Sequence, residues 1–159
     1  MFVATAEGRD DDMRARIARH RAERPAGWRT VEEPLDLVAT CRALPADAEL
    51  ALIDCLTLWV ANRILRGDAG AAIADDARML GALVGERQRA WVIVSNEVGT
   101  GVHPETGDGL RFRDALGLVN QAIAAASDRV TLMVAGIPLC VKDGAPRAAS
   151  VAPHAAGAP

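Results

Sequence analysis

An α/β fold with a mostly parallel sheet and helices on both faces is the fold class that the sequence predicts. Four short segments are nearly continuous apolar runs without polar alternation, as in strands buried on both faces of a parallel sheet. Longer segments with apolar residues at helical spacing separate these runs, and such alternation is typical of βαβ units. The chain has 159 residues, half of them hydrophobic and a quarter charged, which suffices for one globular core.

Each predicted strand is a short apolar run. In chain order, the runs comprise residues 2–6, 50–54, 91–96 and 130–135. Ligands of open α/β sheets bind beyond the carboxyl ends of the strands, so the residues at these ends are the first candidates for a functional site. Acidic side chains lie at three of the four ends, as Glu7, Asp54 and Glu97.

Helices are predicted for the segments that connect the strands. In chain order, they comprise residues 10–23, 34–43, 58–65, 71–89 and 110–126. We expect right-handed crossovers between the parallel strands. A single domain is predicted over residues 1–142. The stretch 143–159 consists largely of Ala, Pro and Gly, has little to bury, and is predicted to be a disordered tail.

The amino-acid composition restricts which partners and which cellular compartment are expected. Eighteen basic and 21 acidic residues give a net charge of −3 without a basic face, so no nucleic-acid partner is predicted. Cys41, Cys55 and Cys140 are far apart and show no CxxC spacing, which argues against a zinc site or a disulfide framework and favours the cytoplasm. No apolar run approaches the roughly 20 residues of a membrane span. Residues 1–6 lead straight into an acidic run, unlike a signal peptide.

Asp54 closes a buried strand, which is the form of a Walker B acid. Such a carboxylate holds Mg²⁺, directly or through water, beside the phosphates of a nucleotide. An Asp at the end of a buried strand is also a common N-cap of the helix that follows. The residues alone leave both interpretations open.

His20 lies among arginines at positions 14, 16, 19, 21 and 24. A neutral imidazole is a good nucleophile near pH 7, and guanidinium groups bind and orient phosphate oxygens. The cluster therefore indicates a histidine nucleophile among phosphate-binding groups, and the alternative is an exposed basic helix face. His103 and His154 are poorer candidates, because they fall in a loop and in the tail. The tryptophans are interpreted as core or subunit contacts: Trp28, Trp59 and Trp91.

Several ordered blocks resemble one known family, the bifunctional adenosylcobinamide kinase / adenosylcobinamide-phosphate guanylyltransferases of cobalamin biosynthesis. The first block, residues 3–34, carries the landmarks Ala4-Thr5-Ala6, Asp12-Met13, Arg16-Ile17, His20-Arg21, Arg24-Pro25, Trp28, Thr30, Glu32 and Pro34. Later blocks carry Asp54, Cys55, Thr57 and Asn62, then Asn96, Glu97 and Gly99, then Phe112, Arg113, Asp114 and Asn120. Residues 134–142, VAGIPLCVK, look like the closing strand of the family. The resemblance covers residues 2–142.

The resemblance implies two activities. One phosphorylates the aminopropanol hydroxyl of adenosylcobinamide with a nucleoside triphosphate. The other transfers GMP from GTP onto that phosphate through a GMP–histidine intermediate, giving adenosyl-GDP-cobinamide and pyrophosphate. His20 stands at the histidine position of the family and is implied to be the nucleophile, and Asp54 matches the Walker B acid and is implied to bind Mg²⁺. The implied nucleotide contacts are Ala4, Thr5, Ala6, Arg21, Ala22, Glu23, Arg24, Glu32 and Asp54.

The resemblance also implies a fold and an assembly. The fold is a P-loop NTPase domain of the RecA-like type, which agrees with the strand pattern. The assembly is a homo-oligomer, commonly a trimer. The implied small-molecule partners are GTP, ATP, adenosylcobinamide and its phosphate, without a nucleic acid or a membrane span.

The sequence departs from the family pattern at its beginning. The family opens with a strand and a GGxRSGKS phosphate loop, whereas this sequence contains no GxxxxGK[ST], and its one lysine is Lys142. Such a loop cradles phosphates with its backbone N–H groups and its Lys, and its Ser/Thr binds Mg²⁺. We therefore expect an N-terminally truncated form of the fold, without the first strand, phosphate loop and first helix of the family. A start inside a longer reading frame, a genuine truncation, and a segment supplied by another chain are the three explanations.

Three functions stay open at this point. The first is the bifunctional enzyme. The second is a truncated, catalytically impaired remnant of that family that binds nucleotides or subunits. The third is another α/β P-loop relative, which the ordered block from His20 to Pro34 and the missing phosphate loop both disfavour.

Overall fold

The computed structural model describes residues 1–144. The chain divides into two compact units, Met1–Ser127 and a second unit that begins at Asp128. The prediction of a single domain over residues 1–142 stays a prediction. Asp143, the first residue of the predicted tail, ends a strand. The rest of that prediction, from residue 145 onward, lies outside the described residues.

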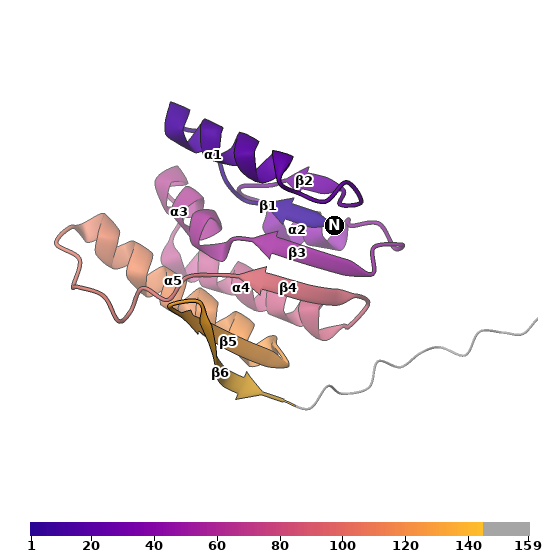
Figure 1. The fold of residues 1–159 in the computed structure, drawn as a ribbon. Helices are drawn as coiled ribbons and strands as arrows, with labels where there is room; N and C mark the ends of the chain where they lie inside the picture. Colours follow the sequence, from indigo (N-terminus) through magenta and orange to yellow (C-terminus); the bar gives the residue numbers. More distant parts are fainter. Residues whose placement is uncertain (145–159) are drawn as a thin grey trace, which may run out of the picture. The chain divides into compact units, whose positions relative to one another are not determined.

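A four-stranded parallel sheet organises the first unit (Figure 1). Its strands are β1 (Phe2–Ala4), β2 (Thr30–Glu32), β3 (Leu50–Asp54) and β4 (Ala90–Val94), in the spatial order β2-β1-β3-β4. All three strand pairs are parallel. The predicted α/β fold class is therefore confirmed. Strand β2 was not predicted, because its three residues contain two polar side chains and give no apolar run.

The helices of the first unit are those that the sequence predicts, with shifted ends. They are α1 (Asp11–Ala22), α2 (Leu37–Arg42), α3 (Leu56–Arg66), α4 (Gly70–Gly85) and α5 (Gly107–Ala126). Asp10 caps α1 by accepting a hydrogen bond from the backbone N–H of Met13 at 2.7 Å. Helix α2 begins three residues later than predicted, since the carboxylate of Glu33 accepts from the N–H groups of Leu35 and Asp36 and holds that segment in a turn.

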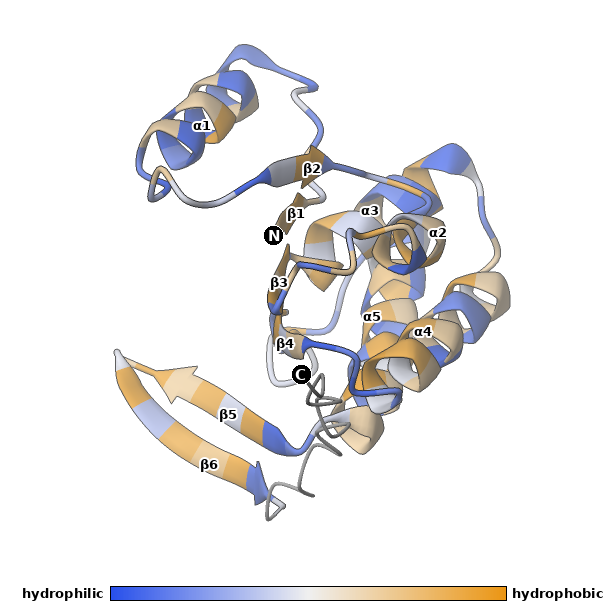
Figure 2. Ribbon diagram, turned by 90° about the vertical axis from the view of Figure 1, so that its right-hand side faces the viewer, coloured by the Kyte–Doolittle hydropathy of each residue, from blue (hydrophilic) through white to orange (hydrophobic). Residues whose placement is uncertain are grey.

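The helices lie on both sides of the sheet, but unequally. Helices α2 to α5 cover one face, and α1 lies alone on the other (Figures 1 and 2). The core forms between the sheet and α2–α5, from fully buried side chains that include Val3, Ile53, Leu56, Trp59, Leu80 and Leu116. The predicted core position of Trp59 is confirmed, and the indole N–H of this residue donates to the carbonyl of Leu35 at 2.8 Å. Helix α1 buries none of its residues.

Within the described residues, the second unit contains a two-stranded antiparallel hairpin of β5 (Arg129–Val134) and β6 (Ile137–Asp143). The prediction of a strand over residues 130–135 is confirmed, but its expected place in the parallel sheet is wrong. Ala135 and Gly136 both have positive φ, 51° and 79°, as in the tight two-residue turns that reverse a chain. Figure 2 colours both strands mostly as hydrophobic, and Met133 and Ile137 are 58% and 70% exposed rather than buried.

Two further findings bear on predictions from composition. No helix of the described part of the chain is long and apolar enough to cross a membrane. The cysteines are unpaired, Cys41 being buried and Cys140 exposed. Burial raises the pKa of the Cys41 thiol to about 12, so this side chain behaves as a small apolar core residue.

Candidate functional site

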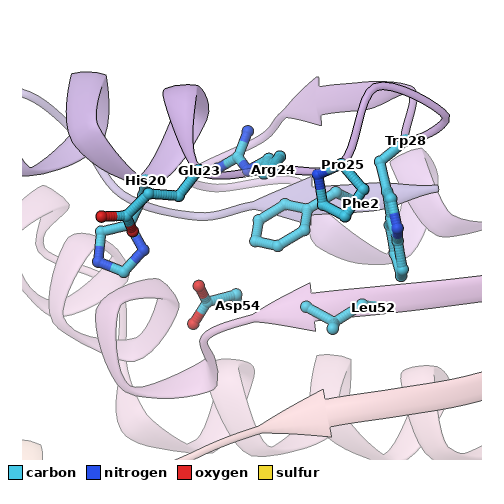
Figure 3. A pocket seen from close by; sticks show the side chains of 8 residues that line it. All are labelled: Phe2, His20, Glu23, Arg24, Pro25, Trp28, Leu52 and Asp54. Atoms are coloured by element: carbon cyan, nitrogen blue, oxygen red, sulfur yellow. The ribbon is translucent and has the colours of Figure 1, made fainter.

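A pocket of about 280 Å³ opens between α1, the segment after it, and the sheet face that α2–α5 leave uncovered (Figure 3). Its lining residues are Phe2, His20, Glu23, Arg24, Pro25, Trp28, Leu52 and Asp54. Four of them are predicted site residues, since the structure brings together His20, Glu23, Arg24 and Asp54.

Strand register places Asp54 in this pocket. Phe2 of β1 is the register partner of Leu52 in β3, and Ala4 is the partner of Asp54. Because side chains two residues apart in a strand point to the same face, Leu52 and Asp54 follow one another along the pocket floor. The Asp54 carboxylate thus lies at the carboxyl end of its strand with no hydrogen-bond partner among the described residues.

The N-cap interpretation of Asp54 is not supported by the geometry. Cys55, not Asp54, occupies the N-cap position of α3, and no side chain caps that helix end. The carboxylate of Asp54 instead faces the pocket (Figure 3). The position therefore suits a ligand-binding acid better than a capping residue.

The last turn of α1 supplies His20. Asp11 and Asp12 lie in the first turn of this helix and basic side chains in its last turn, an arrangement that complements the helix dipole. His20 and Glu23 are three residues apart at the end of α1, so their side chains lie on the same side of the helix (Figure 3). The imidazole of His20 is exposed, and it has no hydrogen-bond partner among the described residues. It is therefore accessible to a phosphorus atom in the pocket.

Aromatic rings and one arginine form the other wall. The rings of Phe2 and Trp28 meet edge to face, with centroids 6.2 Å apart and planes at 73°. The guanidinium carbon of Arg24 lies 3.8 Å from the centroid of the Phe2 ring. This wall offers a flat apolar surface next to a cation, which suits a planar base that carries phosphates.

Arg24 keeps part of its hydrogen-bonding capacity. One of its terminal nitrogens donates to the hydroxyl of Thr30 at 3.1 Å. Its Nε is buried and has no partner among the described residues. Burial first, and then the charge of Arg21, lower the pKa of Arg24, while Asp54 opposes them. An arginine stays protonated despite such shifts, so the wall of the pocket contains a permanent cation.

The remaining predicted site residues do not line the pocket, and their role in nucleotide binding stays a prediction. Arg21 forms an ion pair with Glu32, which links α1 to β2. Thr5 is fully buried, and its hydroxyl is engaged by the backbone of Cys55. The other such residues are Ala4, Ala6 and Ala22.

Four lining residues were not predicted as site residues: Phe2, Pro25, Trp28 and Leu52. Phe2 and Leu52 look like ordinary strand residues, because both faces of these strands are apolar. Trp28 was interpreted as a core or subunit contact, yet it faces the pocket. Leu52 could have been predicted to lie near the site, because side chains two residues apart in a strand point to the same face, and Asp54 follows Leu52 by two residues.

No group of three or more potential metal-ligating side chains gathers within residues 1–144. Mg²⁺, however, is held in nucleotide sites by one or two carboxylates together with substrate phosphates and water. The carboxylate of Asp54 accepts no hydrogen bond from the described residues and shares the lining with Glu23, which fits that ligand chemistry.

The parallel sheet flanked by helices, with an acid at the end of β3, defines an α/β protein whose fold is consistent with the P-loop NTPase type. The model of the cobinamide kinase / cobinamide phosphate guanyltransferase family matches residues 1–141. The bifunctional adenosylcobalamin biosynthesis protein CobP of Pseudomonas aeruginosa is 44% identical over 141 residues, which cover 89% of this chain and 81% of that protein. The bifunctional adenosylcobalamin biosynthesis proteins CobU of Salmonella typhimurium and Escherichia coli are 38% and 37% identical, each over 89% of this chain and 85% of that protein.

The chain therefore belongs to the cobinamide kinase / cobinamide phosphate guanyltransferase family, which confirms the resemblance seen in the sequence. It is an enzyme of that family, and cobalamin biosynthesis is the pathway that the names of its relatives give.

Proposed function

We propose that this chain transfers GMP from GTP to adenosylcobinamide phosphate, with His20 as the nucleophile, and that it makes that phosphate by phosphorylating adenosylcobinamide. The observation that supports the transfer is the shared pocket of His20, Arg24 and Asp54 (Figure 3). A nucleophile, a cation and a carboxylate within one pocket are the groups that a nucleotidyl transfer needs.

The transfer takes two displacements. An imidazole nitrogen of His20 attacks the α-phosphorus of GTP, and an N–P bond forms while the bond from that phosphorus to the β-phosphate oxygen breaks. Pyrophosphate leaves. A phosphate oxygen of adenosylcobinamide phosphate then attacks the same phosphorus, and the electron pair of the N–P bond returns to the imidazole. Because His20 is exposed on α1, the bulky second substrate reaches it without opening the core.

The other lining residues have distinct roles in this proposal. Arg24 binds a phosphate oxygen through the terminal N–H groups that Thr30 leaves unused. The rings of Phe2 and Trp28 contact the planar base. Asp54 would hold Mg²⁺, which when bound neutralises phosphate charge. Nucleotide contacts from residues 4–6 and 21–22 and from Glu32, a homotrimeric assembly and a cytoplasmic location complete the proposal on the strength of the family resemblance.

The test is covalent labelling of the purified chain. With GTP labelled at the α-phosphate, the protein is expected to acquire acid-labile, base-stable label, as a phosphoramidate would give. GTP labelled at the γ-phosphate is expected to leave none. His20→Ala removes the nucleophile and is expected to abolish the label.

His103→Ala is the matched control, because His103 is an exposed loop histidine outside the pocket. This variant is expected to label like the wild type. Label that survives His20→Ala would exclude His20 as the nucleophile. If the chain binds GTP but neither takes up label nor forms adenosyl-GDP-cobinamide, the result would favour the impaired remnant over the enzyme.

A further inference from the structure

A buried amide ties together two strand ends next to the pocket. Asn62 of α3 is 5% exposed. Its Nδ2 donates to the carbonyl of Thr5 at 2.8 Å and to the carbonyl of Pro34 at 3.3 Å. Thr5 directly follows β1, and Pro34 lies just beyond the end of β2. One side chain therefore fixes the carboxyl ends of both strands.

Thr5 extends this link to the third strand. Its hydroxyl donates to the carbonyl of Cys55 at 2.7 Å and accepts from the N–H of Cys55 at 2.8 Å. Its own N–H donates to the carbonyl of Asp54 at 3.0 Å. The ends of β1, β2 and β3 are thus held in one hydrogen-bonded cluster beside the carboxylate that faces the pocket.

The position of His20 depends on the same cluster. Helix α1 has no fully buried residue and follows the end of β1 after a short connection. The ion pair of Arg21 with Glu32 links it to β2, the strand whose end Asn62 also fixes through Pro34. The anchored end of β1 therefore sets where α1 begins, and with it the direction in which His20 points.

We propose that Asn62 is a positioning residue for guanylyl transfer. It lines no part of the pocket, and it acts by fixing the ends of β1, β2 and β3, which determines how His20 and Asp54 face each other. The inference rests on the proposed function. It adds Asn62 as a residue that does not contact the substrate but whose loss slows the chemical step.

The structure offers a matched control in Asn120. Its Nδ2 donates to the carbonyl of Asn96 at 3.0 Å, and its Oδ1 accepts from the hydroxyl of Ser95 at 2.6 Å. Asn120 is thus a second amide at the carboxyl edge of the sheet, but it links the end of β4 to α5, and neither element contributes to the pocket lining.

The experiment compares Asn62→Ala and Asn62→Asp with Asn120→Ala in the full chain, below the melting temperature of each. The rate of self-labelling is measured against GTP concentration, and amide hydrogen exchange is followed at residues 4–7. Both Asn62 variants are expected to label about 10- to 100-fold more slowly at saturating GTP, as a small misplacement of reacting groups would cause. They are also expected to exchange faster at residues 4–7, whereas Asn120→Ala keeps both readouts near wild type.

Three outcomes would overturn the inference: folded Asn62 variants with wild-type labelling rates, an equal loss in Asn120→Ala, or unchanged exchange at residues 4–7. If the wild-type chain takes no label at all, the proposed function is wrong, and the exchange data alone decide whether Asn62 orders these strand ends.

Discussion

His20 and Asp54 line the same pocket although they come from different elements, the last turn of α1 and the carboxyl end of β3. Strand β1 brings them together, because it pairs with β3 along one edge and leads into α1 at its end. An exposed imidazole on a helix and a carboxylate at the end of a strand thereby line one pocket. The predictions below follow from that arrangement and from the packing around it.

Asp54→Asn is expected to slow guanylylation by about 100-fold, because it removes the charge that would hold Mg²⁺ in the proposed reaction without changing the shape of the side chain. The measurement is the labelling rate at several Mg²⁺ concentrations. Asp47→Asn is the control, since the carboxylate of Asp47 pairs with Arg29 at 2.9 Å and lies outside the pocket lining. Equal labelling rates in the two variants would exclude a role of Asp54 in guanylylation.

Trp28→Ala is expected to weaken GTP binding by about 5- to 30-fold while leaving the rate at saturating GTP within about twofold. Contact between an aromatic ring and a base contributes about 1–2 kcal/mol, and it acts equally in the ground and transition states. Titration of GTP against the labelling rate separates the two effects. Trp28→Phe keeps a flat ring and is expected to lose much less affinity, and a loss as large as that of Trp28→Ala would contradict the contact with a base.

Asp68 is expected to make the stability of the fold sensitive to acid. Hydrogen bonds from Arg66 and then from Arg63 lower the pKa of Asp68 to about 2. Because this folded-state pKa is below the value of about 3.9 in an unfolded chain, the stabilisation is complete above pH 4 and is lost as the pH falls from about 4 to about 2. We expect the contribution near pH 7 to be about 1–2 kcal/mol after screening by solvent.

Denaturant unfolding of wild type and Asp68→Asn at pH 7, 4 and 2.5 measures this contribution. The difference in the free energy of unfolding is expected to shrink as the pH is lowered. Asp75→Asn is the control, because the pair of Asp75 with Arg78 is exposed on α4. A difference for Asp68→Asn that stays constant with pH would show that the carboxylate charge is not its source.

Much of this fold could be predicted from the sequence, because its longer elements have strong local signals. The helix predicted over residues 110–126 is α5, Gly107–Ala126, and the strand predicted over residues 50–54 is β3, and both predictions came from apolar residues alone. Strand β2 was not, since three residues with two polar side chains become a strand only by pairing with β1. The pairing of residues 130–135 was also missed, because the reversal depends on backbone angles at Ala135 and Gly136.

The charged residues of the candidate site could be predicted from the sequence, but its apolar residues could not. His20 and Asp54 drew attention because an isolated histidine among arginines and an acid at a strand end carry recognisable chemistry. Phe2, Leu52 and Trp28 carry no such signal, since an apolar side chain looks the same whether it faces a core or a pocket. Their role depends on the uncovered face of the sheet, which arises from the placement of helices in three dimensions.

The absence of buried residues in α1 separates the chemistry of this protein from its folding. The free energy that keeps the chain folded comes from the side chains packed between the sheet and α2–α5, none of which belongs to α1. Substitutions along the exposed face of α1 are therefore expected to leave the melting curve almost unchanged, including those that lower activity. Side chains of α1 can therefore be exchanged, for example in a selection for altered activity, without a compensating change in the core.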